Sequence, residues 1–314
     1  MMRFSRLAPV AAGAVALVAA LAKPTPSRAD GEAETTALKE RCATRLAIAF
    51  TGKSASPELA ASANPQDGVE ALLADPLFFE RFARFINSEL NPEAGMMPGE
   101  DAAYTLTKHV MTDGKLPWKD MFVGAYDVTD AVTPNANGLG YFRSKAWMER
   151  YAGNEAQGYR LAAAYRIMQN TTGLELVATT NVEGVDDTAA GRQNVACAGC
   201  HYTGWFALDL VAKTLTKTKR DKDGVVTFPA NSVDGPQTVL GGKTIANDKE
   251  LVQALVDSDN FKVNTCRLAF KFLYGRAETT CEGPVFDKCV DAFSSAGTMQ
   301  SALSTIAKDA TFCQ

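Results

Sequence analysis

The sequence predicts a mostly α-helical protein with one small β-hairpin. Three observations predict this class: several stretches repeat apolar side chains at helical spacing, cap signals bound many of those stretches, and only residues 219–228 resemble a hairpin. With 314 residues, 46% of them hydrophobic and 22% charged, the chain has the composition of a globular protein. Its net charge of −4 argues against a nucleic-acid-binding protein, which usually carries a basic surplus.

The first 29 residues resemble a secretory signal peptide. Two arginines precede an apolar run at residues 7–22, and Ser27-Arg28-Ala29 offers small residues for cleavage near Ala29-Asp30. This run is short for a membrane span, and no later stretch predicts a transmembrane anchor. Cleavage removes four basic residues and no acidic ones, which leaves 28 basic against 36 acidic residues and a net charge of −8. We therefore expect a soluble, acidic protein exported to the periplasm or the cell exterior, where disulfides form.

Residues 30–185 are expected to form a helical N-terminal domain. Glu34 to Phe50 has apolar residues at helical spacing and stops at Thr51-Gly52, a C-cap signal. Ser56-Pro57 and Asp75-Pro76 each look like an N-cap followed by proline at the first helical position. The second pair opens the clearest helix, whose apolar face carries Phe78, Phe79, Phe82, Phe85, Ile86 and Leu90. Further helices are expected at about residues 100–112, 117–126, 144–152 and 157–169.

Residues 186–314 are expected to form a second helical domain, because the polar stretch at 171–192 shows no strong periodicity. A helical region at 193–212 is followed by a charged turn at 219–224 and an apolar run at 225–228, which together predict the hairpin. The remaining helices are expected at about residues 247–258, 260–274, 284–294 and 299–310.

The segment Cys197-Ala-Gly-Cys200-His201 is the attachment signature of a c-type haem. Two cysteines three residues apart at a helix start can bond the two vinyl groups of one porphyrin edge, and the adjacent histidine can ligate the iron. A thioredoxin-like motif would be expected near a βαβ pattern, and a structural zinc site would need a fourth ligand. The sequence shows neither feature, which disfavours both alternatives. We therefore predict one covalently attached haem c, with thioethers at Cys197 and Cys200 and His201 as proximal ligand.

The sixth iron ligand stays open among three possibilities. His109 is the only other histidine, and Met97 lies in a Met-Pro loop that offers a thioether. An iron without a sixth protein ligand would favour catalysis over simple electron transfer. Arg192 and Arg276 are candidate partners for the haem propionates, although surface arginines would look the same.

Five cysteines remain outside the haem signature, and four of them fall in the last 49 residues. In an exported chain this clustering predicts two disulfides. We expect Cys266–Cys281 and Cys289–Cys313, with Cys42 as a buried helical thiol, although spacing alone does not give the connectivity.

The surroundings of the haem signature resemble a known group of proteins. Gly191-Arg192 precedes the signature, and further matching residues follow it in order: Gly204–Asp209, Lys219–Gly224, Gly241–Lys243, Glu250–Leu255, Cys266, Leu273–Arg276, Cys281, Phe293–Gly297 and Ile306–Phe312. Looser matches occur in the N-terminal half at Arg45–Gly52, Leu73–Phe79 and Leu116–Asp120. The chain is similar to the exported planctomycete- and myxobacterial-type cytochrome c proteins of unknown function. This resemblance implies one covalent haem in a helical exported protein.

These observations predict an exported mono-haem cytochrome that transfers electrons between periplasmic redox partners. Because the mature chain is acidic, those partners are expected to present basic surfaces. The alternative is a haem enzyme, either a peroxidase or an oxidoreductase for an organic substrate. Electron transfer alone needs only about 100 residues, a small domain, so it leaves the large N-terminal domain without a role.

Overall fold

The computed structural model describes residues 28–91, 102–112, 114, 116–152, 160–176, 183–186, 188–216, 219–220, 226–227 and 234–314. Most of the predicted signal peptide, residues 1–27, lies outside these ranges, and so does Met97. Residues Leu38–Gln314 form one compact unit. The domain boundary predicted near residue 185 stays a prediction.

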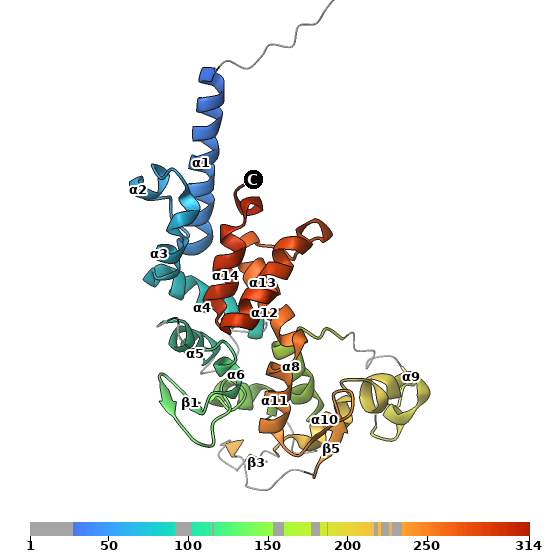
Figure 1. Cartoon of the computed structure of the whole chain (residues 1–314). Helices are drawn as coiled ribbons and strands as arrows, with labels where there is room; N and C mark the ends of the chain where they lie inside the picture. Colours follow the sequence, from blue (N-terminus) through green and yellow to red (C-terminus); the bar gives the residue numbers. More distant parts are fainter. Residues whose placement is uncertain are drawn as a thin grey trace, which may run out of the picture. The chain divides into compact units, whose positions relative to one another are not determined.

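The described chain is mostly helical, which confirms the predicted fold class (Figure 1). The helical elements of the first half are α1 (Arg28–Thr51), α2 (Pro57–Ala60), η1 (Pro65–Gly68), α3 (Val69–Leu73), α4 (Pro76–Leu90), α5 (Ala102–Met111), α6 (Asp120–Val123), α7 (Lys145–Trp147), η2 (Met148–Ala152) and α8 (Leu161–Thr172). Those of the second half are η3 (Gly191–Gln193), α9 (Val195–Ala198), η4 (Gly199–Thr203), α10 (Leu208–Thr214), α11 (Asp248–Val256), α12 (Asp259–Tyr274), η5 (Thr280–Glu282), α13 (Gly283–Ala296), α14 (Met299–Lys308) and η6 (Ala310–Cys313). In the parts of the chain that the structure describes, no helix is long and apolar enough to cross a membrane.

The predicted cap signals end and begin helices where expected. Helix α1 ends at Thr51, and Gly52 takes a left-handed conformation with φ +70°, which glycine adopts without a Cβ clash. The side chain of Asp75 accepts a hydrogen bond from Leu77 N at 2.8 Å and caps α4. Ser56 caps α2 in the same way through Leu59 N.

Three two-stranded antiparallel sheets occur in the described residues. Strands β3 (Lys219–Arg220) and β4 (Val226–Thr227) form the predicted hairpin. The other two pairs were not predicted: β1 (Tyr126–Val128) with β2 (Val132–Pro134), and β5 (Gln237–Val239) with β6 (Lys243–Ile245). Each of these strands is two or three residues long, too short to show an alternating pattern.

The core joins helices from both halves of the chain. Phe78, Phe82 and Ile86 of α4 are fully buried, as their spacing on one helix face predicts. The Phe82 ring meets Phe272 of α12 edge-on, with centroids 5.0 Å apart. Helix α12 also packs against α8, α13 and α14, and α14 packs against α3. The last helices therefore complete the core that the first ones begin.

The predicted number of disulfides is confirmed, but the predicted pairing is wrong. Cys42 pairs with Cys313, with their Cα atoms 4.7 Å apart, and Cys266 pairs with Cys289, at 6.0 Å. Cys42 is buried in α1, as predicted, but it is bonded and not a free thiol. Cys281 is the exposed free cysteine of this set and lies in η5. Packing of α12 on α13 brings Cys266 to Cys289, whereas the prediction paired cysteines that are consecutive in the sequence.

Candidate functional site

The Cys-Ala-Gly-Cys-His segment occupies two short helical elements, α9 and η4. The side chain of Asn194 caps α9 by accepting a hydrogen bond from Ala196 N. Element η4 is a π-helical turn, and the Thr203 hydroxyl donates to the Ala198 carbonyl, five residues back, at 3.2 Å. Turns of this wider kind recur at functional sites. Both Cys197 and Cys200 are free thiols, the first half-buried and the second exposed.

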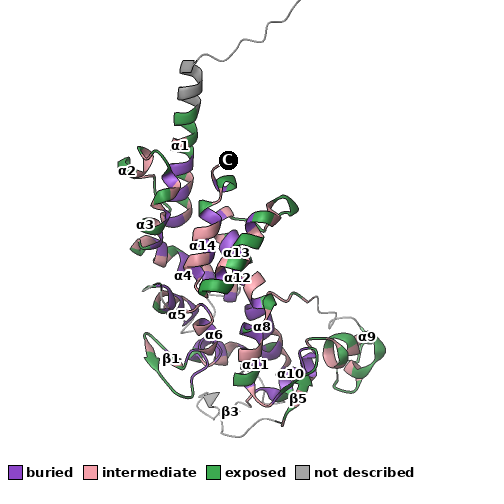
Figure 2. Cartoon of the chain, in the orientation of Figure 1, coloured by how far each residue is buried: buried purple, intermediate pink, exposed green. Residues whose placement is uncertain are grey.

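No residue around the motif is fully buried. None of the 16 residues from Gly191 to Phe206 is buried, and Figure 2 shows α9 without buried colouring. Two of its apolar side chains are conspicuously exposed, Val195 at 94% and Trp205 at 36%. Because apolar burial is the main force that orders a chain, this segment supplies little of its own stability. An apolar group that covered this segment would bury its apolar side chains and so stabilise it.

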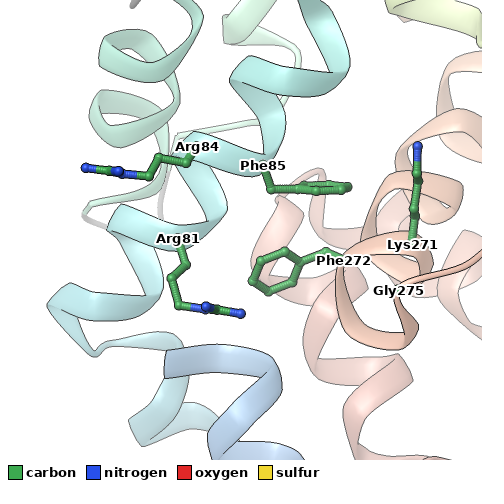
Figure 3. A pocket seen from close by; sticks show the side chains of 6 residues that line it. All are labelled: Arg81, Arg84, Phe85, Lys271, Phe272 and Gly275. Carbon is green, nitrogen blue, oxygen red and sulfur yellow. The ribbon is translucent and has the colours of Figure 1, made fainter. Parts of the chain in front are cut away.

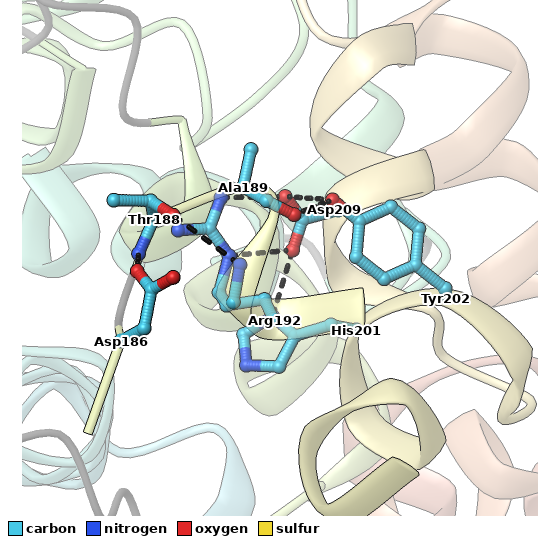
Figure 4. A network of polar contacts seen from close by, with 8 residues as sticks. Asp186, Thr188, Ala189, Arg192, His201, Tyr202 and Asp209 are labelled. Atoms are coloured by element: carbon cyan, nitrogen blue, oxygen red, sulfur yellow. Dashed lines mark hydrogen bonds and ion pairs between the residues drawn. The ribbon is translucent and has the colours of Figure 1, made fainter. Parts of the chain in front are cut away.

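A polar network centred on Asp209 holds this segment to the rest of the fold (Figure 4). Arg192 donates two hydrogen bonds to the Asp209 carboxylate, from Nε to Oδ2 at 3.0 Å and from an Nη to Oδ1 at 2.7 Å. The His201 Nδ1 lies 2.7 Å from Oδ2 of the same carboxylate. The Tyr202 hydroxyl contacts Oδ1 at 3.2 Å and the Ala189 carbonyl at 3.0 Å. Three side chains of the segment thus converge on one buried acid.

Asp209 is fixed because it lies in the first turn of a well-packed helix. Helix α10 buries Val211 and Ala212 and packs against α8 and β5. The residue before it, Ala207, has φ 25°, and Leu240, in the turn between β5 and β6, has φ 52°. Leu240 N donates to the Trp205 carbonyl at 3.0 Å, so both unusual conformations adjoin the motif. Backbone strain of this kind concentrates at functional sites.

The network combines an ionised carboxylate, a guanidinium cation and a neutral phenol. Burial by itself would raise the pKa of Asp209, but the hydrogen bonds from Arg192 and His201 outweigh it and hold that pKa below its ordinary value. Burial and the neighbouring Asp209 charge raise the pKa of Tyr202, so its hydroxyl keeps its proton. An ionised carboxylate only accepts hydrogen bonds, and therefore His201 Nδ1 carries the proton in this contact.

This tautomer leaves Nε2 of His201 available for a metal. Histidines that ligate metals commonly donate their other ring N–H to a carboxylate, which fixes the orientation of the ring. The free thiols of Cys197, four residues before His201, and Cys200, directly before it, accompany an oriented histidine. Together with the exposed apolar side chains of the same segment, they suit a covalently attached haem. Within the described ranges, no three His, Cys, Asp or Glu side chains are grouped to hold a metal ion. A haem iron does not need such a group, since the porphyrin supplies four of its ligands.

The structure does not bring His109 to the motif. His109 lies on α5, is exposed and meets the ring of Tyr126 edge-on at 5.1 Å. Helices α5 and α9 lie at opposite sides of the unit in Figure 1. The two arginines proposed as propionate partners each bind a carboxylate of the chain, Arg192 that of Asp209 and Arg276 that of Glu282.

A hollow of about 370 Å³ lies between α4 and α12, apart from the motif (Figure 3). It is lined by Arg81, Arg84, Phe85, Lys271, Phe272 and Gly275. Arg84 is bonded to Glu80 and Lys271 to Glu89, at 2.8 and 2.7 Å. Arg81 donates to the Ile48 carbonyl at 3.4 Å. These cations thus already have partners on the chain.

Sequence reasoning assigned no role to Asp209. One signal for it exists, because Asp209 is the one acidic residue between Thr188 and Arg220, a stretch that contains the whole motif. What the sequence does not show is that the first turn of α10 lies against both Arg192 and His201.

Comparison with known proteins adds no relative. No protein-family model, no curated protein and no solved structure matches this chain.

Proposed function

We propose that this protein carries one covalently attached haem c and acts as an exported electron-transfer cytochrome. The observation that carries the proposal is the pairing of His201 Nδ1 with Asp209, which leaves Nε2 available next to the free thiols of Cys197 and Cys200. The resemblance of the motif's surroundings to exported cytochrome c proteins supports the same conclusion.

Each residue of the site has a distinct part in this proposal. Cys197 and Cys200 would form the thioethers, and His201 would ligate the iron through Nε2. A bound haem supplies one-electron redox chemistry at its iron. Val195 and Trp205 offer it apolar surface, and burying them would stabilise the otherwise unburied segment.

The surroundings fit an exported carrier. Two disulfides in the described chain suit an oxidising compartment, in agreement with the predicted signal peptide. The net charge of −8 calculated for the mature chain would steer it toward redox partners with basic surfaces, faster at low ionic strength than at high.

A second candidate function is a haem enzyme with an open sixth position. The position of His109 on α5, across the unit from α9, favours it. A carboxylate on the ligating histidine also raises the basicity of that ligand, which suits an iron that reacts with small molecules. Optical and resonance Raman spectra in both redox states distinguish the two. Low-spin iron that resists cyanide indicates a carrier, and high-spin iron that binds cyanide or peroxide indicates an enzyme.

Haem attachment is tested by intact mass spectrometry after expression in a host that matures c-type cytochromes. We expect the mature chain to gain the mass of one haem and to keep it after acid–acetone extraction. The double variant Cys197→Ala/Cys200→Ala should lose it. Cys281→Ala is the matched control, because it also removes a free, exposed thiol but lies outside the motif. A wild-type chain without the added mass, or a double variant that retains it, would refute the proposal.

A further inference from the structure

We propose that Asp209 is the positioning residue of the iron ligand His201, and that Arg192 limits the negative charge that Asp209 presents to it. This inference rests on the proposed haem function, and it adds a determinant of the reduction potential outside the Cys-Ala-Gly-Cys-His motif.

The geometry assigns the two oxygens of Asp209 different partners. Oδ2 accepts from His201 Nδ1 at 2.7 Å and from Arg192 Nε at 3.0 Å, while Oδ1 accepts from an Arg192 Nη at 2.7 Å and contacts the Tyr202 hydroxyl. The Asp209 side chain is 9% exposed and the Arg192 side chain 12%, so water screens their charges little. The imidazole therefore has one strong acceptor in a fixed direction.

The position of Asp209 explains why it can orient a ligand that lies on an unburied segment. His201 is on η4, none of whose residues is fully buried, whereas Asp209 belongs to α10, which packs against α8 and β5. Because Asp209 is held in place by the packing of α10, its hydrogen bond to Nδ1 fixes the orientation of the imidazole ring. Without it, no described hydrogen bond would fix the rotation of this ring.

The charges predict opposite effects of the two partners on the iron. An acceptor carboxylate makes the imidazole a stronger electron donor, which stabilises ferric over ferrous iron and lowers the reduction potential. The positive guanidinium of Arg192 binds both oxygens and so reduces the negative charge that the carboxylate presents to the imidazole. Removing the carboxylate should thus raise the potential, and removing the guanidinium should lower it.

A second pair in the same unit provides the matched control. Arg143 also donates to both oxygens of an aspartate, Asp248, at 3.0 Å each, and Asp248 is 7% exposed against 8% for Asp209. The pair joins the loop after Gly140 to the first turn of α11, and no histidine contacts it in the described structure. Loss of Asp248 should cost comparable stability without touching the iron ligand.

The experiment compares the holoprotein with Asp209→Asn, Arg192→Gln and Asp248→Asn, measuring haem content by pyridine haemochrome and midpoint potential by spectroelectrochemistry. We expect the potential to shift up in Asp209→Asn, down in Arg192→Gln, and not at all in Asp248→Asn. Asp209→Glu, which keeps the charge, should shift the potential less than Asp209→Asn does.

Two outcomes overturn the inference alone: a haem-loaded Asp209→Asn protein with the wild-type potential, or a shift no larger than that of Asp248→Asn. If Asp209→Asn yields no holoprotein, Arg192→Gln decides, since a lowered potential supports the inference and an unchanged one refutes it. A wild-type chain that takes up no haem overturns the proposed function and this inference together.

Discussion

Replacing both Cys42 and Cys313 with alanine should destabilise the protein more than replacing Cys266 and Cys289. The first bridge joins residues 271 positions apart and the second joins residues 23 apart. In the chain-entropy account, a cross-link stabilises the fold by restricting the unfolded chain, and the effect grows with the logarithm of the loop length. It amounts to about 5–6 kcal/mol for the long loop and about 3 kcal/mol for the short one at 25 °C.

The assay is urea unfolding of the purified mature protein, followed by circular dichroism. Each double variant should lower the transition midpoint, and the difference between them should be about 2 kcal/mol in the free energy of unfolding. Cys281→Ala serves as the control, since its thiol is free and exposed, and it should stay within about 0.5 kcal/mol of wild type.

The reasoning fails if the Cys42→Ala/Cys313→Ala variant is no less stable than the Cys266→Ala/Cys289→Ala variant. It also fails if peptide mapping without reduction finds Cys289 joined to Cys313, because the long loop would then not exist. Alkylation before reduction should label Cys281 and leave the four bridged cysteines unlabelled.

Three other predictions concern separate parts of the molecule. Hydrogen bonds from Tyr104, then Arg84 and Lys108, lower the pKa of Glu80 from 4.5 to about 2. The ionised Glu80 should therefore contribute its full stabilisation above pH 4.5 and lose it as the pH falls toward 2. The loss of stability in Tyr104→Phe at pH 6 should vanish near pH 2, and a loss that stays constant with pH would contradict this. Asp75→Ala removes the N-cap of α4 and should cost about 1 kcal/mol in urea unfolding, with Asp75→Asn retaining most of the stability. Cys197→Ala/Cys200→Ala should make the segment 191–206 the fastest-exchanging part of the described chain by hydrogen–deuterium exchange, and protection equal to that of the holoprotein would show that a haem does not order it.

Local signals in the sequence located the helices well. Asp75 and Pro76 open α4, and Gly52 follows the end of α1, because a cap or a left-handed residue acts within one turn of its own position. The region predicted to be helical over 193–212 consists of three separate elements, α9, η4 and α10. The division falls at Gly204–Ala207, where Leu240 N binds the Trp205 carbonyl, a contact between residues 35 positions apart.

The candidate site shows the same division between local and distant information. The spacing of Cys197, Cys200 and His201 is contained in five consecutive residues, so the sequence states it completely. The cysteine pairing was predicted wrongly, because Cys42 meets Cys313 only through the packing of the first helix with the last turn.

The sequence by itself determined that this protein is mostly helical, where most of its helices begin and end, and that it carries the attachment signature of a c-type haem. These features depend on residues within a few positions of one another. Only the tertiary structure decided which cysteines pair, that His109 lies apart from the motif, and that Asp209 faces His201 and Arg192. Such contacts depend on how α10 packs against α8 and β5, and that packing is set by apolar side chains spread across the whole chain.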